Sequence, residues 1–81
     1  MNASDLAQVL FTTTLQASDH PTGERVRAVI GERLRAVGLS GCTAQVAQEA
    51  GDHPEAYLER MRWALDAVSL AYAPRLCLVA A

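Results

Sequence analysis

Residues 53–72 read HPEAYLERMRWALDAVSLAY, and this stretch decides the fold class because its apolar residues recur at helical spacing. At roughly 100° per residue, one broad sector of a helix collects Tyr57, Leu58, Met61, Ala64, Leu65, Val68, Ala71 and Tyr72. The polar side collects Glu59, Arg62, Asp66 and Ser69. We therefore predict a long amphipathic helix over 53–72 whose broad apolar sector faces the core.

Three further helices are predicted upstream, over residues 5–16, 20–37 and 43–50. Gly38 is expected to end the second of these in a left-handed backbone conformation. A strand over VLFTTTL is the alternative for the first helix, but no second strand is predicted with which it could pair. The prediction is a compact all-α bundle of two short and two long helices.

The phrase Asp-His-Pro occurs twice, at 19–21 and at 52–54. An aspartate can cap a helix, and a proline in the first helical turn loses no hydrogen bond. We interpret both copies as helix starts, with Asp19 and Asp52 as caps. An ancient duplication of a helical hairpin is the alternative origin of the repeat.

Composition and charge limit the classes of protein to which this chain could belong. The 81 residues predict a single domain over 1–81 with an apolar C-terminal tail at 73–81, and 51% of them are hydrophobic. All seven basic residues are arginine and the net charge is −2, which disfavours a generic nucleic-acid binder. The N-terminus does not resemble a secretory signal, and no apolar run suits a membrane. We expect a cytoplasmic protein in which Cys42 and Cys77 are reduced.

The residues that could carry chemistry are few. His20 and His53 are the only histidines, and both are expected on exposed first turns of helices. Cys42 is expected to be a small buried thiol rather than a nucleophile. No metal-ligand spacing or phosphate-binding glycine motif is present. The sequence therefore predicts a protein that is not an enzyme and has no cofactor, metal or catalytic residues.

A DNA-binding function is the rival hypothesis. TAQVAQEAGDHPEAYLERM at 43–61 resembles a bacterial helix-turn-helix, in which V-A-x-x-A-G, here residues 46–51, precedes the turn. The resemblance implies a regulator that uses residues 43–62, with Arg60 and Arg62 reaching phosphates. Asp52 departs from the pattern, because an apolar residue usually stands there, and the acidic Glu59 opposes a polyanion.

A second resemblance covers most of the chain. Its motifs are L-F-T-x-x-L-Q-x-S-D-H-P at 10–21, A-Q-E-x-G-D-H-P-E at 47–55 and R-M-R-W-A at 60–64. In these motifs the chain is similar to small α-helical proteins of actinobacteria. This resemblance implies a helical fold and brings no activity or site residue with it.

Apolar residues outside the predicted core faces suggest what the protein does. Such residues are Trp63, Ala67 and Leu70 on the fourth helix, and Phe11 and Leu15 on the first. Spare apolar helix faces in so short a chain predict burial against a partner, either a second copy in a homodimer or another protein. The alternative is that the tail RLCLVAA folds back over Trp63 and Leu70.

Overall fold

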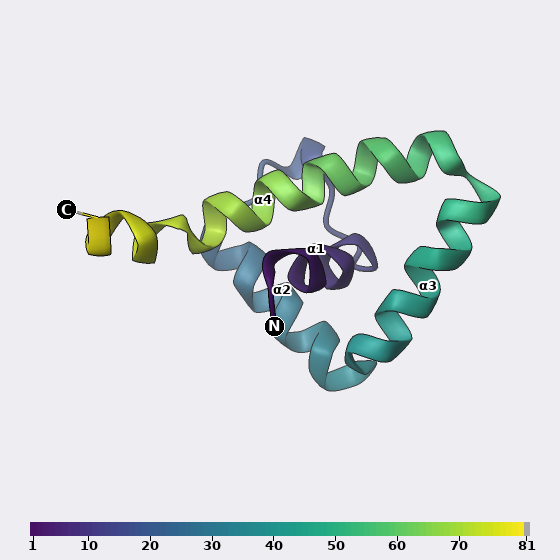
Figure 1. Ribbon diagram of the computed structural model, residues 1–81, viewed down its shortest axis with the longest axis horizontal. Coiled ribbons are helices and arrows are strands. Elements are labelled where there is room, and N and C mark those ends of the chain that lie inside the picture. The colour runs from purple at the N-terminus through teal and green to yellow at the C-terminus, as the bar shows by residue number, and fades with distance from the viewer. Residues whose placement is uncertain (81) are drawn as a thin grey trace.

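The computed structural model describes the backbone of residues 1–80 and the side chains of residues 1–73. The elements are α1 (Ala3–Phe11), the short 3-10 helix η1 (Ala17–Asp19), α2 (Gly23–Ala36), α3 (Gly38–Asp52) and α4 (Pro54–Ala80). In Figure 1, α2, α3 and α4 form the sides of a triangle that surrounds α1. The described part of the chain contains no strand, so the predicted all-α bundle is confirmed and the strand over 9–15 is not formed.

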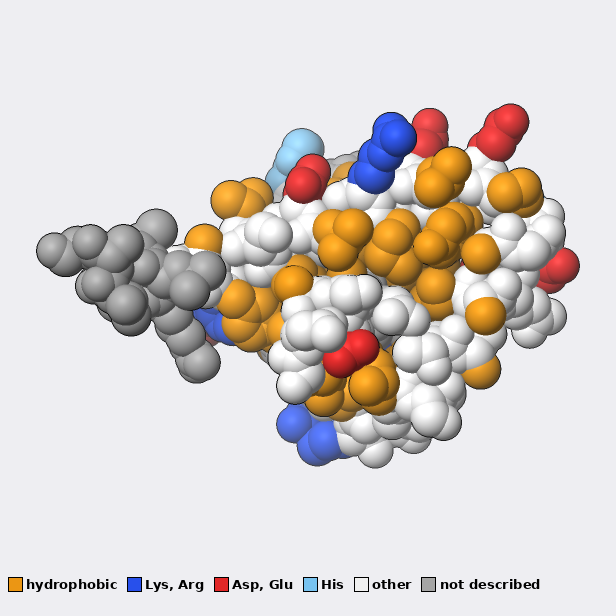
Figure 2. Space-filling model, in the orientation of Figure 1, with side chains coloured by type: hydrophobic (Ala, Val, Ile, Leu, Met, Phe, Trp, Pro, Cys, Tyr) orange, Lys and Arg blue, Asp and Glu red, His pale blue; other side chains and the backbone are white. Residues whose placement is uncertain are grey.

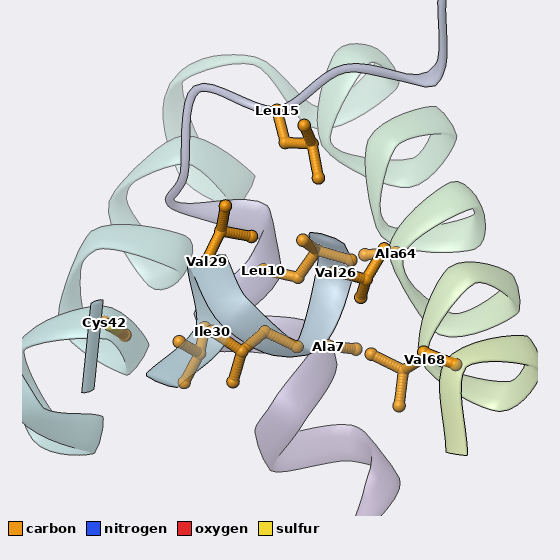
Figure 3. Close-up of a cluster of buried hydrophobic side chains, with 11 residues drawn as sticks. Ala7, Leu10, Leu15, Val26, Val29, Ile30, Cys42, Ala64 and Val68 are labelled. Atoms are coloured by element: carbon orange, nitrogen blue, oxygen red, sulfur yellow. The ribbon is translucent and has the colours of Figure 1, made fainter. Parts of the chain in front are cut away.

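α1 is the centre of the core because it packs against α2, α3 and α4. Its residues Ala7, Val9 and Leu10 have no exposed surface. Figure 3 shows the side chains of Leu10, Val26 and Ala64 gathered between α1, α2 and α4. A short helix can occupy this position because three longer helices pack around its apolar residues.

α1 ends at Phe11, five residues before the predicted end at 16. The hydroxyl groups of Thr12 and Thr13 donate to the carbonyl oxygens of Val9 and Leu10, at 2.8 and 2.7 Å. These threonine hydroxyls satisfy carbonyls that another helical turn would have used, which is a known way for Thr to compete with helix. The helix begins earlier than predicted because Asn2 and Asp5 form a capping box.

The first Asp-His-Pro phrase does not start α2, so this prediction is wrong. Asp19 accepts a hydrogen bond from the backbone of Gln16 at 2.9 Å and therefore stabilises the turn before it. His20 has a left-handed backbone with φ of 46°. Thr22 is the cap of α2, since its hydroxyl accepts from the Arg25 amide at 3.1 Å. The second helix consequently starts at Gly23 rather than at 20.

α2 and α3 join with almost no loop. Gly38 has a φ of 83°, which confirms the predicted left-handed position after α2. The next helix begins at this same residue. α3 therefore spans 15 residues, and the predicted bounds 43–50 are too short at both ends. Arg33 of α2 links this helix to the end of α1 and to α3. It donates to the Thr12 hydroxyl at 3.2 Å and to the Gln45 side-chain oxygen at 3.1 Å.

α4 is longer than predicted at its C-terminal end. The second Asp-His-Pro phrase does mark its start, because Pro54 is its first residue, but Asp52 belongs to α3. The helical backbone continues to Ala80, so the predicted end of this helix at residue 72 is wrong. Arg27 donates to the carbonyl oxygen of Ala71. Pro74, three residues later, has no backbone N–H to donate. Apart from Ala73, the side chains of the predicted apolar tail lie outside the described residues.

No helix among the described residues combines the length and the apolar character that crossing a bilayer requires.

Candidate interaction surface

α4 carries apolar residues on more of its circumference than the bundle covers. Its buried face is the line of Ala64, Val68 and Ala71, which have at most 1% exposure. We call the set Leu58, Met61, Leu65 and Tyr72 the leucine edge, and the set Trp63, Ala67 and Leu70 the tryptophan edge. By helical periodicity these edges flank the buried face on opposite sides. A narrow polar strip separates them on the outer surface and consists of Glu59, Arg62, Asp66 and Ser69.

The tryptophan edge is partly covered by the chain itself. Trp63 and Ala67 are half-buried, whereas Leu70 is 75% exposed. A shallow groove of ≈ 300 Å³ runs between this edge and the segment around η1, and its lining includes Ala17, His20 and Pro21. The predicted surface residues Trp63, Ala67 and Leu70 therefore do lie together, but residues 17–21 form the facing wall of the groove beside the indole.

Phe11 and Leu15 are not part of any exposed surface, so this part of the prediction is wrong. Their side chains are only 7% and 8% exposed. The Phe11 ring lies 5.8 Å from that of Tyr57, between the end of α1 and the start of α4. Leu15 follows α1 rather than belonging to it, and the chain turns back after Thr13 so that this leucine joins the core.

Arg60 holds the end of α1 against α4. Its guanidinium donates to the carbonyl oxygens of Phe11, Thr13 and Leu15, at 2.9, 2.8 and 2.9 Å. It also lies 5.0 Å from the centroid of the Trp63 ring. Burial lowers the pKa of this guanidinium below its usual value. The donors of Arg60 are thus directed inward at the last carbonyl of α1 and at two carbonyls of the segment that follows it.

The two arginines predicted to contact nucleic acid are in different environments. Arg62 is exposed on the polar strip, whereas Arg60 is engaged with the backbone of residues 11–15. Gly51, which would start the turn of a helix-turn-helix, lies inside α3. Only His53 separates α3 from α4, so this corner is shorter than the three- or four-residue turn of that motif.

The leucine edge is the surface that sequence reasoning missed. Leu58 and Leu65 are 53% and 40% exposed, although the sequence pattern assigned both to the core. The buried face is centred instead on small residues, and a Cβ atom placed on Gly23 would lie 3.1 Å from the Ala71 Cα. Such close approach of two helix backbones requires small side chains. Ala64 and Ala71 are seven residues apart and therefore share one face of the helix. This spacing of small residues was the signal that could have located the buried face.

The residues considered for chemistry are dispersed. His20 lies after η1 and His53 lies at the corner between α3 and α4, and both are exposed. Cys42 is fully buried, and its Sγ lies 3.5 Å from the Thr12 hydroxyl oxygen. Within the described residues, no three His, Cys, Asp or Glu side chains lie together as a metal site. The side chain of Cys77 lies outside the described part of the chain.

Comparison with protein-family models, with curated proteins and with solved structures gives no match to this chain.

Proposed function

We propose that this chain is a non-enzymatic protein-interaction or regulatory module that acts as a homodimer, with α4 as its contact helix. The observation that supports the proposal is the exposure of Leu58 and Leu65 on the leucine edge of α4. Single exposed leucines are common in monomeric proteins, but these two lie in one apolar line with Met61 and Tyr72. A second copy is the simplest partner because most soluble oligomers are symmetric homo-oligomers.

The expected strength of such a dimer follows from the area that these leucines expose. Burying a half-exposed leucine contributes roughly 1 kcal/mol, and a symmetric contact buries the same leucines on both chains. The gain is then on the order of 4 kcal/mol before Met61 and Tyr72 are counted. Association itself costs about 4–15 kcal/mol. We therefore expect a dimer that is in equilibrium with the monomer rather than an obligate one.

The homodimer is tested by unfolding the protein at several concentrations. If only the dimer buries the α4 surface, dissociation accompanies unfolding and the thermal midpoint rises with protein concentration. Circular dichroism at 222 nm gives this midpoint for a helical protein. A midpoint that is the same at every concentration contradicts a homodimer.

The proposal treats the chain as non-enzymatic because its candidate chemical groups do not converge. The two histidines lie at separate corners, and the Cys42 thiol is buried inside the bundle. A nucleophile needs a base within hydrogen-bond reach, and the neighbour of this thiol is the Thr12 hydroxyl. A cytoplasmic location belongs to the same proposal and rests on the sequence alone.

DNA binding is the competing proposal, and the bundle gives it less support. Its phosphate contacts would depend on Arg62, because Arg60 already donates to three carbonyl oxygens. Fluorescence anisotropy with a labelled duplex at low salt tests this directly. Binding that weakens with added salt and is lost in Arg62→Ala would favour DNA binding over the interaction module.

A further inference from the structure

The leucine edge of α4 is spaced for packing against another helix. Leu58, Met61 and Leu65 follow one another at intervals of three and four residues, which is the spacing of a coiled-coil seam. Tyr72 is seven residues after Leu65 and continues the same line. Figure 2 shows hydrophobic side chains gathered along α4 on the viewed face. An apolar line of this kind suits a helix of a partner rather than an extended peptide.

The polar neighbours of the two edges favour different occupants. Glu59 and Asp66 lie beside the tryptophan edge, and both are exposed. A symmetric contact through that edge would bring carboxylates from the two copies together, which is unfavourable. The polar positions nearest the leucine edge are Arg62 and Ser69, each four residues after one of its leucines. A second copy can therefore approach the leucine edge without pairing carboxylates.

We propose that the leucine edge packs against the leucine edge of a second copy, with the two α4 helices antiparallel. This inference rests on the proposed homodimer and specifies its interface. Leu58 and Tyr72 are each seven residues from Leu65, so a two-fold axis near Leu65 sets Leu58 opposite Tyr72 of the second copy. Antiparallel helices also oppose their macrodipoles, which a parallel pair would align.

A matched pair of substitutions distinguishes the two edges. Leu65→Glu places a charge in the proposed contact, and Leu70→Glu makes the same change on the tryptophan edge at a more exposed residue. We expect light scattering to give a dimer for the wild type and for Leu70→Glu, and a monomer for Leu65→Glu. Leu58→Glu, at another half-exposed position, should also be monomeric and guards against a folding defect specific to residue 65.

The outcomes separate this inference from the proposed function. A dimeric wild type that stays dimeric in both Leu65→Glu and Leu58→Glu overturns the leucine-edge interface and leaves the homodimer standing. Loss of the dimer in Leu70→Glu alone assigns the contact to the tryptophan edge and also overturns the inference. A monomeric wild type contradicts the homodimer itself.

The antiparallel orientation is tested by a distance between spin labels. A nitroxide on Glu55→Cys, in a Cys77→Ser background, labels the exposed start of α4, while the buried Cys42 is shielded from the reagent. Ten residues separate Glu55 from Leu65, so antiparallel helices place the two labels roughly 30 Å apart along the axis. Parallel helices would place them close to the interaxial distance of about 10 Å. A peak at the short distance overturns the antiparallel arrangement.

Discussion

The Arg60 side chain contacts Phe11 in two ways. Its Nε donates to the Phe11 carbonyl oxygen at 2.9 Å, and its guanidinium carbon lies 5.5 Å from the centroid of the same residue's ring. One side chain of α4 thus fixes both the backbone and the ring at the end of α1. This contact determines which face of α4 turns inward, and so which apolar residues remain outside.

Replacing Arg60 tests its role in holding α1. We expect Arg60→Ala to lower the free energy of unfolding by about 2–4 kcal/mol, because three carbonyl oxygens lose a charged donor. Arg60→Lys should recover only part of this loss, since one ammonium group cannot reproduce the planar set of donors. Urea denaturation followed by circular dichroism gives these values.

Arg62→Ala is the control for Arg60, because Arg62 lies two residues away and is exposed. It should change the free energy of unfolding by less than about 0.5 kcal/mol. If Arg62→Ala costs as much as Arg60→Ala, the stabilising role assigned to the contacts with residues 11–15 is wrong.

Leu15 is a core residue although it lies in the segment between α1 and η1. Leu15→Ala should cost about 2–5 kcal/mol in the free energy of unfolding, as expected for a buried leucine that leaves a cavity. Leu70→Ala removes the same atoms from a side chain that is 75% exposed and should cost less than about 0.5 kcal/mol. Equal costs for the two variants would contradict the burial described for Leu15.

Replacing Gly51 or Gly23 by alanine should change the free energy of unfolding in opposite directions. Gly51 lies in the last turn of α3 with open space around its Cα, so Gly51→Ala should stabilise the protein by about 0.5–1 kcal/mol. Gly23→Ala would set a Cβ 3.1 Å from the Cα of Ala71 and should destabilise the protein by about 1–2 kcal/mol. Thermal unfolding of both variants measures the difference, and stabilisation by Gly23→Ala would show that α2 and α4 are farther apart.

The fold class could be predicted from the sequence because it depends on local periodicity. The stripe of Val26, Val29 and Ile30 predicted α2, and all three residues are buried. Gly38 marked the end of that helix because a left-handed residue there is nearly a glycine requirement. Helix ends were less predictable where side chains compete with the helix, as Thr12 and Thr13 do at the end of α1.

The interaction surface was predicted only in part, because burial depends on distant contacts. Periodicity gives the apolar sector of α4 but not its centre, and the centre is set by Arg60 and by the close approach of Gly23 to Ala71. The resulting rotation exposes Leu58 and Leu65 and half-covers Trp63. The burial of Leu15 depends on a turn that no short-range pattern in the sequence indicated.

Sedimentation equilibrium of the wild-type chain tests most directly whether α4 is a contact helix between two copies. We predict a molar mass that rises with concentration from 8.7 kDa toward twice that value, as a monomer–dimer equilibrium requires. A mass that stays at 8.7 kDa at every concentration would contradict the account and leave the exposed leucines of α4 without the partner proposed for them.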